Sequence, residues 1–177
     1  ADQVDQWWTK SAAKQQIDLL TVQLAAPKYR GITGWDRGKK MEELGGLYKN
    51  LPTGSRMDNL DRCIGCLEEA RELFPRKTYP KDWGRVTTNL ANAYDDRLSG
   101  SKADNVDKAI ALHESLLEVR TREAYPEDWA MTTMNLANAY RSRLSGSKAE
   151  NVEKAIALCE SSLEVYTREA YPEDWAM

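Results

Sequence analysis

Apolar side chains recur at helical spacing over most of the chain. Residues 1–26 contain no glycine or proline before Pro27, and their apolar residues approximate one helical stripe: Val4, Trp7, Trp8, Ala12, Ile17, Leu20 and Leu24. The alternation of apolar and polar residues that is typical of strands is essentially absent. The pattern therefore predicts an all-α protein that begins with a helix over residues 1–26.

A block of 46 residues is written twice in the chain. Tyr-Pro-Lys-Asp-Trp opens the first copy at residue 79, Tyr-Pro-Glu-Asp-Trp opens the second at residue 125, and a third opening follows at residue 171. Between the openings, Asn-Leu-Ala-Asn-Ala-Tyr at residues 89–94 returns at residues 135–140. A fixed period of this size is typical of stacked-repeat architectures, in which neighbouring repeats bury a continuous core.

Each copy divides into two predicted helices. The first begins at the Tyr-Pro opening, because proline and acidic residues suit a first helical turn, and it runs to about Leu98 or Leu144. After a Ser-Gly-Ser turn, the second helix begins near Asn105 or Asn151 and runs to about residue 123 or 169.

A degenerate copy precedes these two. Leu44 and Tyr48 lie 46 residues before Leu90 and Tyr94, although a Gly-Gly pair at residues 45–46 lowers helix propensity there. An atypical terminal repeat is expected in such arrays, and we expect the Trp-Trp pair of the first helix to cover it. The chain then has five parts: a capping helix with its connection (1–34), a degenerate repeat (35–78), two full repeats (79–124 and 125–170) and the start of a fourth (171–177).

Composition narrows the class of protein. The chain is 41% hydrophobic and 30% charged, with a formal net charge of −3 and both signs interspersed. It lacks a basic stripe for nucleic acid, an apolar run long enough for a membrane helix, and a signal peptide. Three cysteines in 177 residues suit a reducing compartment better than a disulfide scaffold. We expect a cytoplasmic protein that binds neither nucleic acid nor membrane.

The repeated residues resemble the tetratricopeptide repeat family. Leu136-Ala137 and Tyr140 match the first helix of that 34-residue repeat, and Ala155 and Ile156 match the second. Two insertions of six residues bring the length to 46, so both helices should be longer than usual in the family. The resemblance implies a right-handed α-solenoid of antiparallel helix pairs, here three pairs preceded by one helix.

The extended form is similar to repeats of cyanobacterial multidomain proteins, in which such arrays often precede a caspase-like CHAT peptidase. The asparagine-rich first helix also resembles the repeats of kinesin light chains, which bind extended peptides.

No residue set in the chain predicts catalysis, a cofactor or a metal. Cys63 and Cys66 form a CxxC, but structural zinc needs about four ligands, and only Cys159 and His113 remain as soft ligands. His113 and Cys159 occupy equivalent positions in successive repeats. Side chains one repeat apart are too far from each other for the hydrogen bond between a nucleophile and its base. The cysteines are therefore interpreted as packing residues and the protein as a non-enzyme. Trp83, Trp129 and Trp175 are likewise interpreted as core residues, each packed against the preceding second helix.

The asparagines of the first helices are the candidate binding residues. Asn89, Asn92, Asn135 and Asn138 recur in mid-helix, where asparagine is a poor helix former. An amide can donate and accept, so Asn92 and Asn138 could hold a peptide backbone or form a structural bond between helices, whereas we favour the structural role for Asn89 and Asn135. In the family, first helices line the concave face, which implies these peptide-binding residues: Glu42, Arg85, Thr88, Asn92, Asp96, Met131, Met134, Asn138 and Ser142.

Three functions remain open from the sequence. The first is a scaffold that binds a protein or peptide on the concave face of the array. The second is the regulatory half of a larger effector, such as a CHAT peptidase. The third is a structural array that self-associates end to end through an open C-terminal face, to which Ile156 and Leu163 contribute.

Overall fold

A computed structural model of the chain describes residues 2–25 and 33–165, with side chains from residue 11 onward. This part of the chain is all-α and contains no strand, as the sequence predicts. Its helices are α1 (Asp2–Ala25), α2 (Gly34–Asn50), α3 (Arg56–Leu73), α4 (Pro80–Asp96), α5 (Lys102–Leu117), α6 (Pro126–Ser142) and α7 (Lys148–Leu163). No helix in the described ranges is long and apolar enough to cross a membrane.

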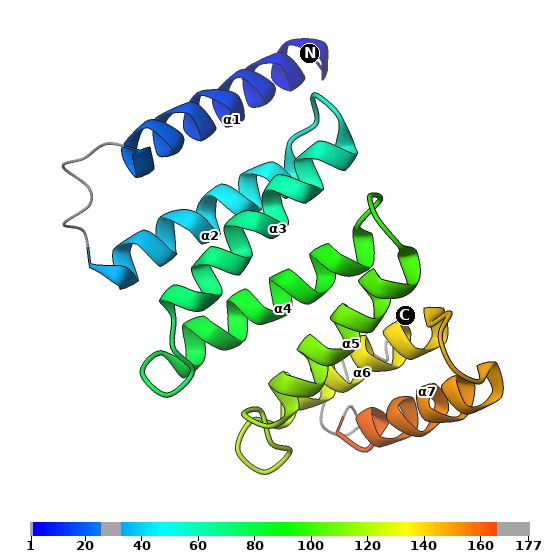
Figure 1. Ribbon diagram of the computed structural model, residues 1–177. Helices are drawn as coiled ribbons and strands as arrows, with labels where there is room; N and C mark the ends of the chain where they lie inside the picture. The colour runs from blue at the N-terminus through cyan, green and yellow to red at the C-terminus, as the bar shows by residue number, and fades with distance from the viewer. Residues whose placement is uncertain (1, 26–32, 166–177) are drawn as a thin grey trace. The chain divides into compact units, whose positions relative to one another are not determined.

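The helices form two compact units, Ala1–Ser99 and Gly100–Met177, here called unit 1 and unit 2. The division falls between α4 and α5, the two helices of the predicted repeat 79–124. Within unit 1, α1 packs on α2, α2 on α3 and α3 on α4. Within unit 2, α6 packs on both α5 and α7 (Figure 1). In both units, therefore, the most extensive packing is between helices that are successive in the chain.

Serine side chains fix the starts of the second helices. The hydroxyl oxygens of Ser101 and Ser147 accept hydrogen bonds from the backbone N–H of Asp104 and Glu150, which satisfies an otherwise unpaired donor of the first turn. As a result, α5 and α7 begin three residues before the predicted positions. Gly100, which precedes the first of these caps, has a φ of +73° that a residue with a side chain rarely adopts.

The second helices also end earlier than predicted. α5 stops at Leu117 instead of about residue 123, because the following residues form a tighter turn in which Val119 N–H donates to Leu116 O, three residues back instead of four. Tyr125 then has an extended φ of −144°, as expected for a residue that precedes proline. Most of the residues that lengthen the repeat at this point therefore form a connection and not helix.

Glycines allow α2 and α3 to approach closely in unit 1. A Cβ on Gly45 would lie 3.1 Å from Leu67 Cγ and 3.3 Å from Cys63 O. A Cβ on Gly38 would lie only 2.7 Å from the Phe74 ring. Gly45 of the Gly-Gly pair, which weakens helix propensity, thus gives room for packing against the second helix of its own repeat.

A polar network, here called the Tyr–Arg–Ser network, joins α3 to α4 in unit 1. Arg97 Nε and Ser99 Oγ both donate to Asp61 Oδ1, at 2.8 and 2.6 Å, and Tyr94 Oη donates to Glu68 Oε1 at 2.5 Å. Hydrogen bonds from Ser99 and Arg97 lower the pKa of Asp61, so the carboxylate stays ionised at neutral pH.

The same network joins α5 to α6 in unit 2, displaced by 46 residues. Arg143 Nε and Ser145 Oγ donate to Asp107 Oδ1 at 2.7 and 2.8 Å, and Tyr140 Oη donates to Glu114 Oε1 at 2.9 Å. The repetition shows that one second helix meets the next first helix in the same way in both units.

The tryptophans differ in burial. Trp83 is buried, with the guanidinium groups of Arg71 and Arg76 at 5.5 and 5.3 Å from its ring, as the core interpretation predicts. Trp129 is only half-buried and has Arg122 at 5.5 Å over its ring. Trp175 and the side chains of Trp7 and Trp8 lie outside the described residues.

The CxxC cysteines are free thiols in α3. Cys63 is buried and Cys66 is half-buried. Burial raises the pKa of each thiol to about 11, so both are protonated at neutral pH and are poor nucleophiles and metal ligands. No group of three or more His, Cys, Asp or Glu side chains that could hold a metal is found over the described ranges.

Candidate functional site

The predicted binding residues of α4 and α6 lie on the least buried face of each helix. On α4 this outer face consists of Arg85, Thr88, Asn89, Asn92 and Asp96, all exposed or half-buried. On α6 the outer face consists, at an offset of 46 residues, of Met131, Met134, Asn135, Asn138 and Ser142. The spacing i, i+3, i+4, i+7 and i+11 puts each set on one side of its helix. The other side of each helix supplies buried core residues.

The charged residues of the unit 1 face are paired with one another. Glu42 of α2 is only 8% exposed and accepts a hydrogen bond from Arg85 of α4. Arg85 also donates to Asp82 Oδ1 at 2.8 Å. Glu42 is therefore buried beneath an ion pair, and a ligand could reach its carboxylate only by displacing Arg85.

Asp82 is the centre of this ionic cluster. It accepts hydrogen bonds from Lys39 Nζ at 2.6 Å and from Trp35 Nε1 at 3.0 Å, in addition to the bond from Arg85. Partial burial opposes ionisation, but these three donors outweigh it and lower the pKa of Asp82 to about 2. The cluster keeps its charges compensated at neutral pH and ties the starts of α2 and α4 together.

Two further predicted residues of unit 1 have partners within the unit. Asp96 Oδ2 lies 3.4 Å from Lys49 Nζ at the other end of the face. The Thr88 hydroxyl donates to Gly84 O at 2.9 Å. The charges of Arg85 and Asp96 are thus largely neutralised inside unit 1.

The corresponding face of unit 2 is uncharged over the predicted residues. Met131 is exposed, and Met134 is half-buried with its sulfur 3.9 Å from Cys159 Sγ. The Ser142 hydroxyl donates to the backbone oxygens of Asn138 and Ala139 at 3.2 and 3.1 Å. The face therefore presents flexible thioethers beside the Asn138 amide.

The asparagines fall into two classes. Asn59 and Asn151, which lie in the first turns of α3 and α7, are buried, and their amides donate to Thr53 O at 2.8 Å and to Ser145 O at 2.9 Å. Asn92 is half-buried and Asn138 is exposed, and neither amide bonds to another residue in the described part of the chain.

The same holds for Asn89, which is exposed, and for Asn135, which is half-buried. Over the described ranges neither amide forms the inter-helix bond that the sequence led us to favour. All four amides of the outer faces are therefore available to a ligand.

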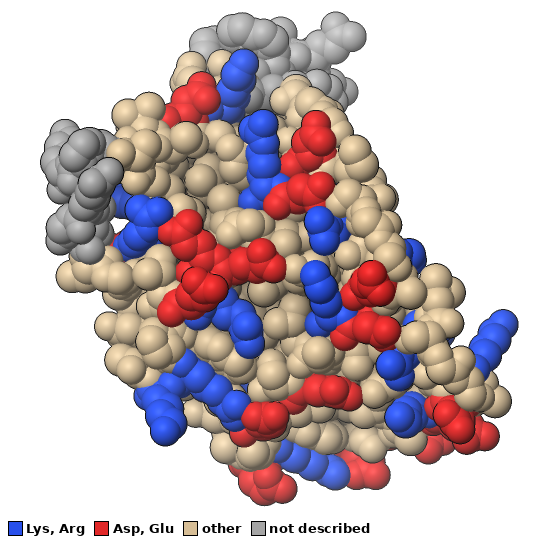
Figure 2. All heavy atoms as spheres, in the orientation of Figure 1, with Lys and Arg blue, Asp and Glu red and all other residues tan. Residues whose placement is uncertain are grey.

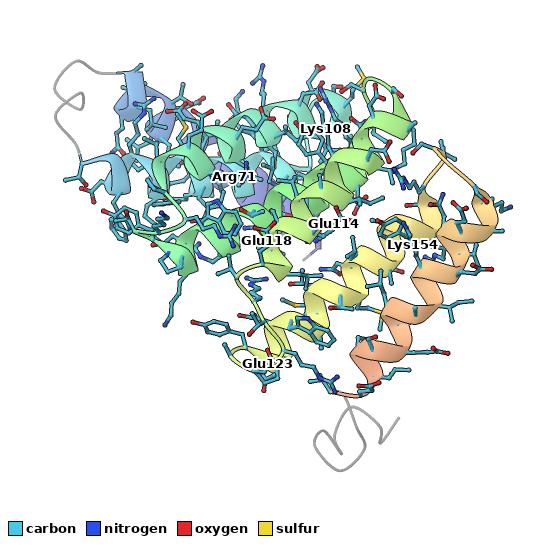
Figure 3. All side chains as sticks on the ribbon, turned by 60° about the horizontal axis from the view of Figure 1, so that its bottom comes forward. Arg71, Lys108, Glu114, Glu118, Glu123 and Lys154 are labelled. Carbon is cyan, nitrogen blue, oxygen red and sulfur yellow. The ribbon has the colours of Figure 1, made fainter. Side chains whose placement is uncertain are left out.

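Each unit also has a hollow that the sequence analysis did not identify, beside the tyrosine of a first helix. In unit 2 a cavity of about 340 Å³ is lined by Tyr140 with Glu114 of α5 and Lys154 of α7, both labelled in Figure 3. Lys154 Nζ lies 5.2 Å from the Tyr140 ring centre. In unit 1 a cavity of about 450 Å³ is lined in part by Tyr48 and Arg62, whose guanidinium lies 5.5 Å from that ring. The signal in the sequence was a cation 14 residues after each tyrosine.

Charged groups of both signs alternate over the face of the molecule shown in Figure 2, and no single-sign stripe is visible there. No protein-family model, no curated protein and no solved structure matches the chain.

Proposed function

We propose that the protein is a peptide-binding scaffold: a right-handed α-solenoid of tetratricopeptide-like helix pairs, in which the outer face of α4 in unit 1 and the outer face of α6 in unit 2 each bind an extended segment of a protein partner. The observation that carries the proposal is the pair Asn92 and Asn138. The two residues are 46 positions apart in the sequence, and each lies in the interior of a helix, where asparagine is unfavourable. Neither side-chain amide forms a hydrogen bond with another residue in the described part of the chain.

Asparagine amides suit this role because each can donate one hydrogen bond and accept another from a peptide backbone. Such contacts hold a chain without reading its side chains. Selectivity then comes from the residues beside each amide, which differ between the two units.

The apolar anchor of the ligand is proposed to lie on α6. Met131 and Met134 offer adaptable, polarisable contact, whereas Arg85 and Asp96 of α4 are already engaged in ion pairs. The favoured ligand is therefore an extended peptide with an apolar side chain next to a stretch held through its backbone. A highly acidic tail is disfavoured, because Arg85 is compensated by Glu42 and Asp82.

Binding is tested by selecting peptides from a random dodecapeptide display library on the immobilised chain and measuring the affinity of the best synthetic peptide by calorimetry. The double variant Asn92→Ala/Asn138→Ala should weaken binding about 5- to 150-fold, because each neutral hydrogen bond contributes roughly 0.5–1.5 kcal/mol. Its stability should not fall, since alanine is the better helix former at both positions.

The matched control is Asn151→Ala, which removes an amide from the structural class. It should lower the free energy of unfolding by about 1–2 kcal/mol and leave peptide affinity unchanged at a temperature where the variant is folded. The proposal fails if the double variant binds normally. It fails as well if that variant is destabilised as much as Asn151→Ala, because the outer amides would then be structural.

A further inference from the structure

α7 is a second copy of α5, but one of its faces is exposed. Val106 and Ile110 of α5 are 0% and 4% exposed, whereas their equivalents Val152 and Ile156 of α7 are 39% and 53% exposed. Leu163, the equivalent of Leu117, is exposed as well. At about 100° per residue, Val152, Ile156 and Leu163 lie within about 40° of one another around the helix. They form a continuous apolar strip, here called the α7 strip.

On α5 the equivalent strip is covered by α6. Val106 and Ile110 belong to one core cluster with Leu136, Ala137 and Tyr140 of α6. Small residues on α6, such as Ala137, let the two helices approach. The partner that this surface accepts in unit 2 is therefore an amphipathic helix with a leucine, small residues and a tyrosine on its apolar side.

An acidic edge borders the strip on both helices. On α5 the edge is Asp107 and Glu114, which receive hydrogen bonds from Arg143, Ser145 and Tyr140 in the Tyr–Arg–Ser network. On α7 the same positions hold Glu153 and Glu160, both exposed. α7 thus keeps the apolar strip and the two carboxylates that α5 uses to hold a first helix.

The acidic edge also discriminates against a second copy of the chain. Two α7 helices packed antiparallel about a two-fold axis would bring the edge of one against the same edge of the other. Glu153 and Glu160 would then face carboxylates, and like charges in such places are destabilising. A helix that carries an arginine and a tyrosine meets the edge with complementary groups.

We propose that the α7 strip and its acidic edge bind a partner helix with the chemistry of a first helix: an apolar stripe of leucine and alanine, a tyrosine for Glu160, and, for Glu153, an arginine with a serine two residues after it. The inference does not depend on peptide binding by the outer faces of α4 and α6. It rests on the interface between α5 and α6, and on the presence in α7 of apolar and acidic residues at the same positions as those that α5 contributes to that interface.

The probe is a synthetic, fluorescein-labelled peptide with the sequence of residues 125–145, which is the segment that covers α5. Added to the full 177-residue chain, it should show saturable binding by fluorescence anisotropy. Ile156→Gln in the chain should weaken binding about ten- to a hundredfold, since it removes a large apolar contact. Ala157→Gln, an exposed position on another side of α7, is the matched control and should change binding less than about twofold.

Exchanging the charges of one ion pair distinguishes specific docking from non-specific hydrophobic binding. Arg143→Glu in the peptide should weaken binding about three- to fivefold, the range of an exposed ion pair. Glu153→Arg in the chain should restore affinity for that peptide and weaken affinity for the original one. A purely apolar contact would not give this reciprocal pattern.

Three results would overturn the proposal. The first is no binding at the highest soluble peptide concentration. The second is binding that Ile156→Gln leaves unchanged, which would mean that the peptide displaces α6 from α5 or binds elsewhere. The third is a concentration-dependent doubling of the mass of the chain alone that Ile156→Gln abolishes, because a second copy would then occupy the strip.

Discussion

α5 and α7 have nearly the same sequence and the same local structure, but differ in burial. Both are 16-residue helices with a serine N-cap, and both carry valine, isoleucine and leucine at matching places. In α5 the valine and isoleucine are buried under α6, whereas in α7 they are exposed. The difference shows that the repeat encodes a helix with an apolar face. Whether this face is buried in the core depends on the presence of a neighbouring helix.

The largest expected difference is between the two isoleucines. Ile110→Ala should lower the free energy of unfolding by about 2–5 kcal/mol, because it leaves a cavity in the cluster between α5 and α6. Ile156→Ala should change stability by less than about 1 kcal/mol, since the side chain is half in solvent. Urea unfolding of both variants gives the comparison. Equal losses would mean that the α7 strip is already covered in solution.

A second difference depends on pH. His113 is fully buried in α5, and burial, reinforced by the charge of Arg120, lowers its pKa to about 4. An unfolded histidine has a pKa of about 6.5, so unfolding takes up a proton in the window between these values. The stability contributed by neutral His113 is complete above pH 6.5 and is lost as the pH falls towards 4, by roughly 2 kcal/mol at pH 5.

His113→Cys, which copies the residue of α7 at position 159, should remove this component. The two proteins should therefore diverge in unfolding free energy between pH 7 and pH 5 and run parallel above pH 7. Curves that stay parallel down to pH 5 would show that His113 is accessible to protons in the folded state.

The smallest expected effect is one in which the two helices should not differ. Ser101→Ala and Ser147→Ala each remove an N-cap hydrogen bond of the same geometry, and each should lower the free energy of unfolding by about 1 kcal/mol. A cap acts within its own first turn and does not need the neighbouring helix. A loss at Ser101 more than twice that at Ser147 would show that burial of the α5 strip also strengthens its cap.

The sequence predicts those features of the structure that depend on residues close by in the chain. Helical periodicity and the Tyr-Pro openings locate the helices, and the 46-residue offset identifies equivalent positions in them. For α5 and α7 the sequence predicts ends six residues later than the structure shows, because apolar spacing does not reveal the i→i−3 hydrogen bonds, such as Val119 N–H to Leu116 O, that end these helices.

Contacts between side chains that are far apart in the sequence are not predicted. The outer-face positions of α4 follow from spacing, but the burial of Glu42 under Arg85 joins residues 43 positions apart. The residue types do not predict this hydrogen bond, because arginine and glutamate side chains are usually exposed to solvent. The exposure of Ile156, in contrast, is expected from the sequence as part of an open face, although Ile110 has the same residues around it in sequence and is buried.

The packing of each helix against its neighbours in the chain has a consequence for how the protein folds. Within each unit the packed pairs are α1 with α2, α2 with α3, α3 with α4, α5 with α6 and α6 with α7. Contacts between segments close in sequence require only short loops to close, so the search for them is fast. Within each unit, folding can then begin at any packed helix pair and spread to the neighbouring helices of that unit. A nascent chain could complete one pair while the next is still being synthesised, without waiting for a distant segment to arrive.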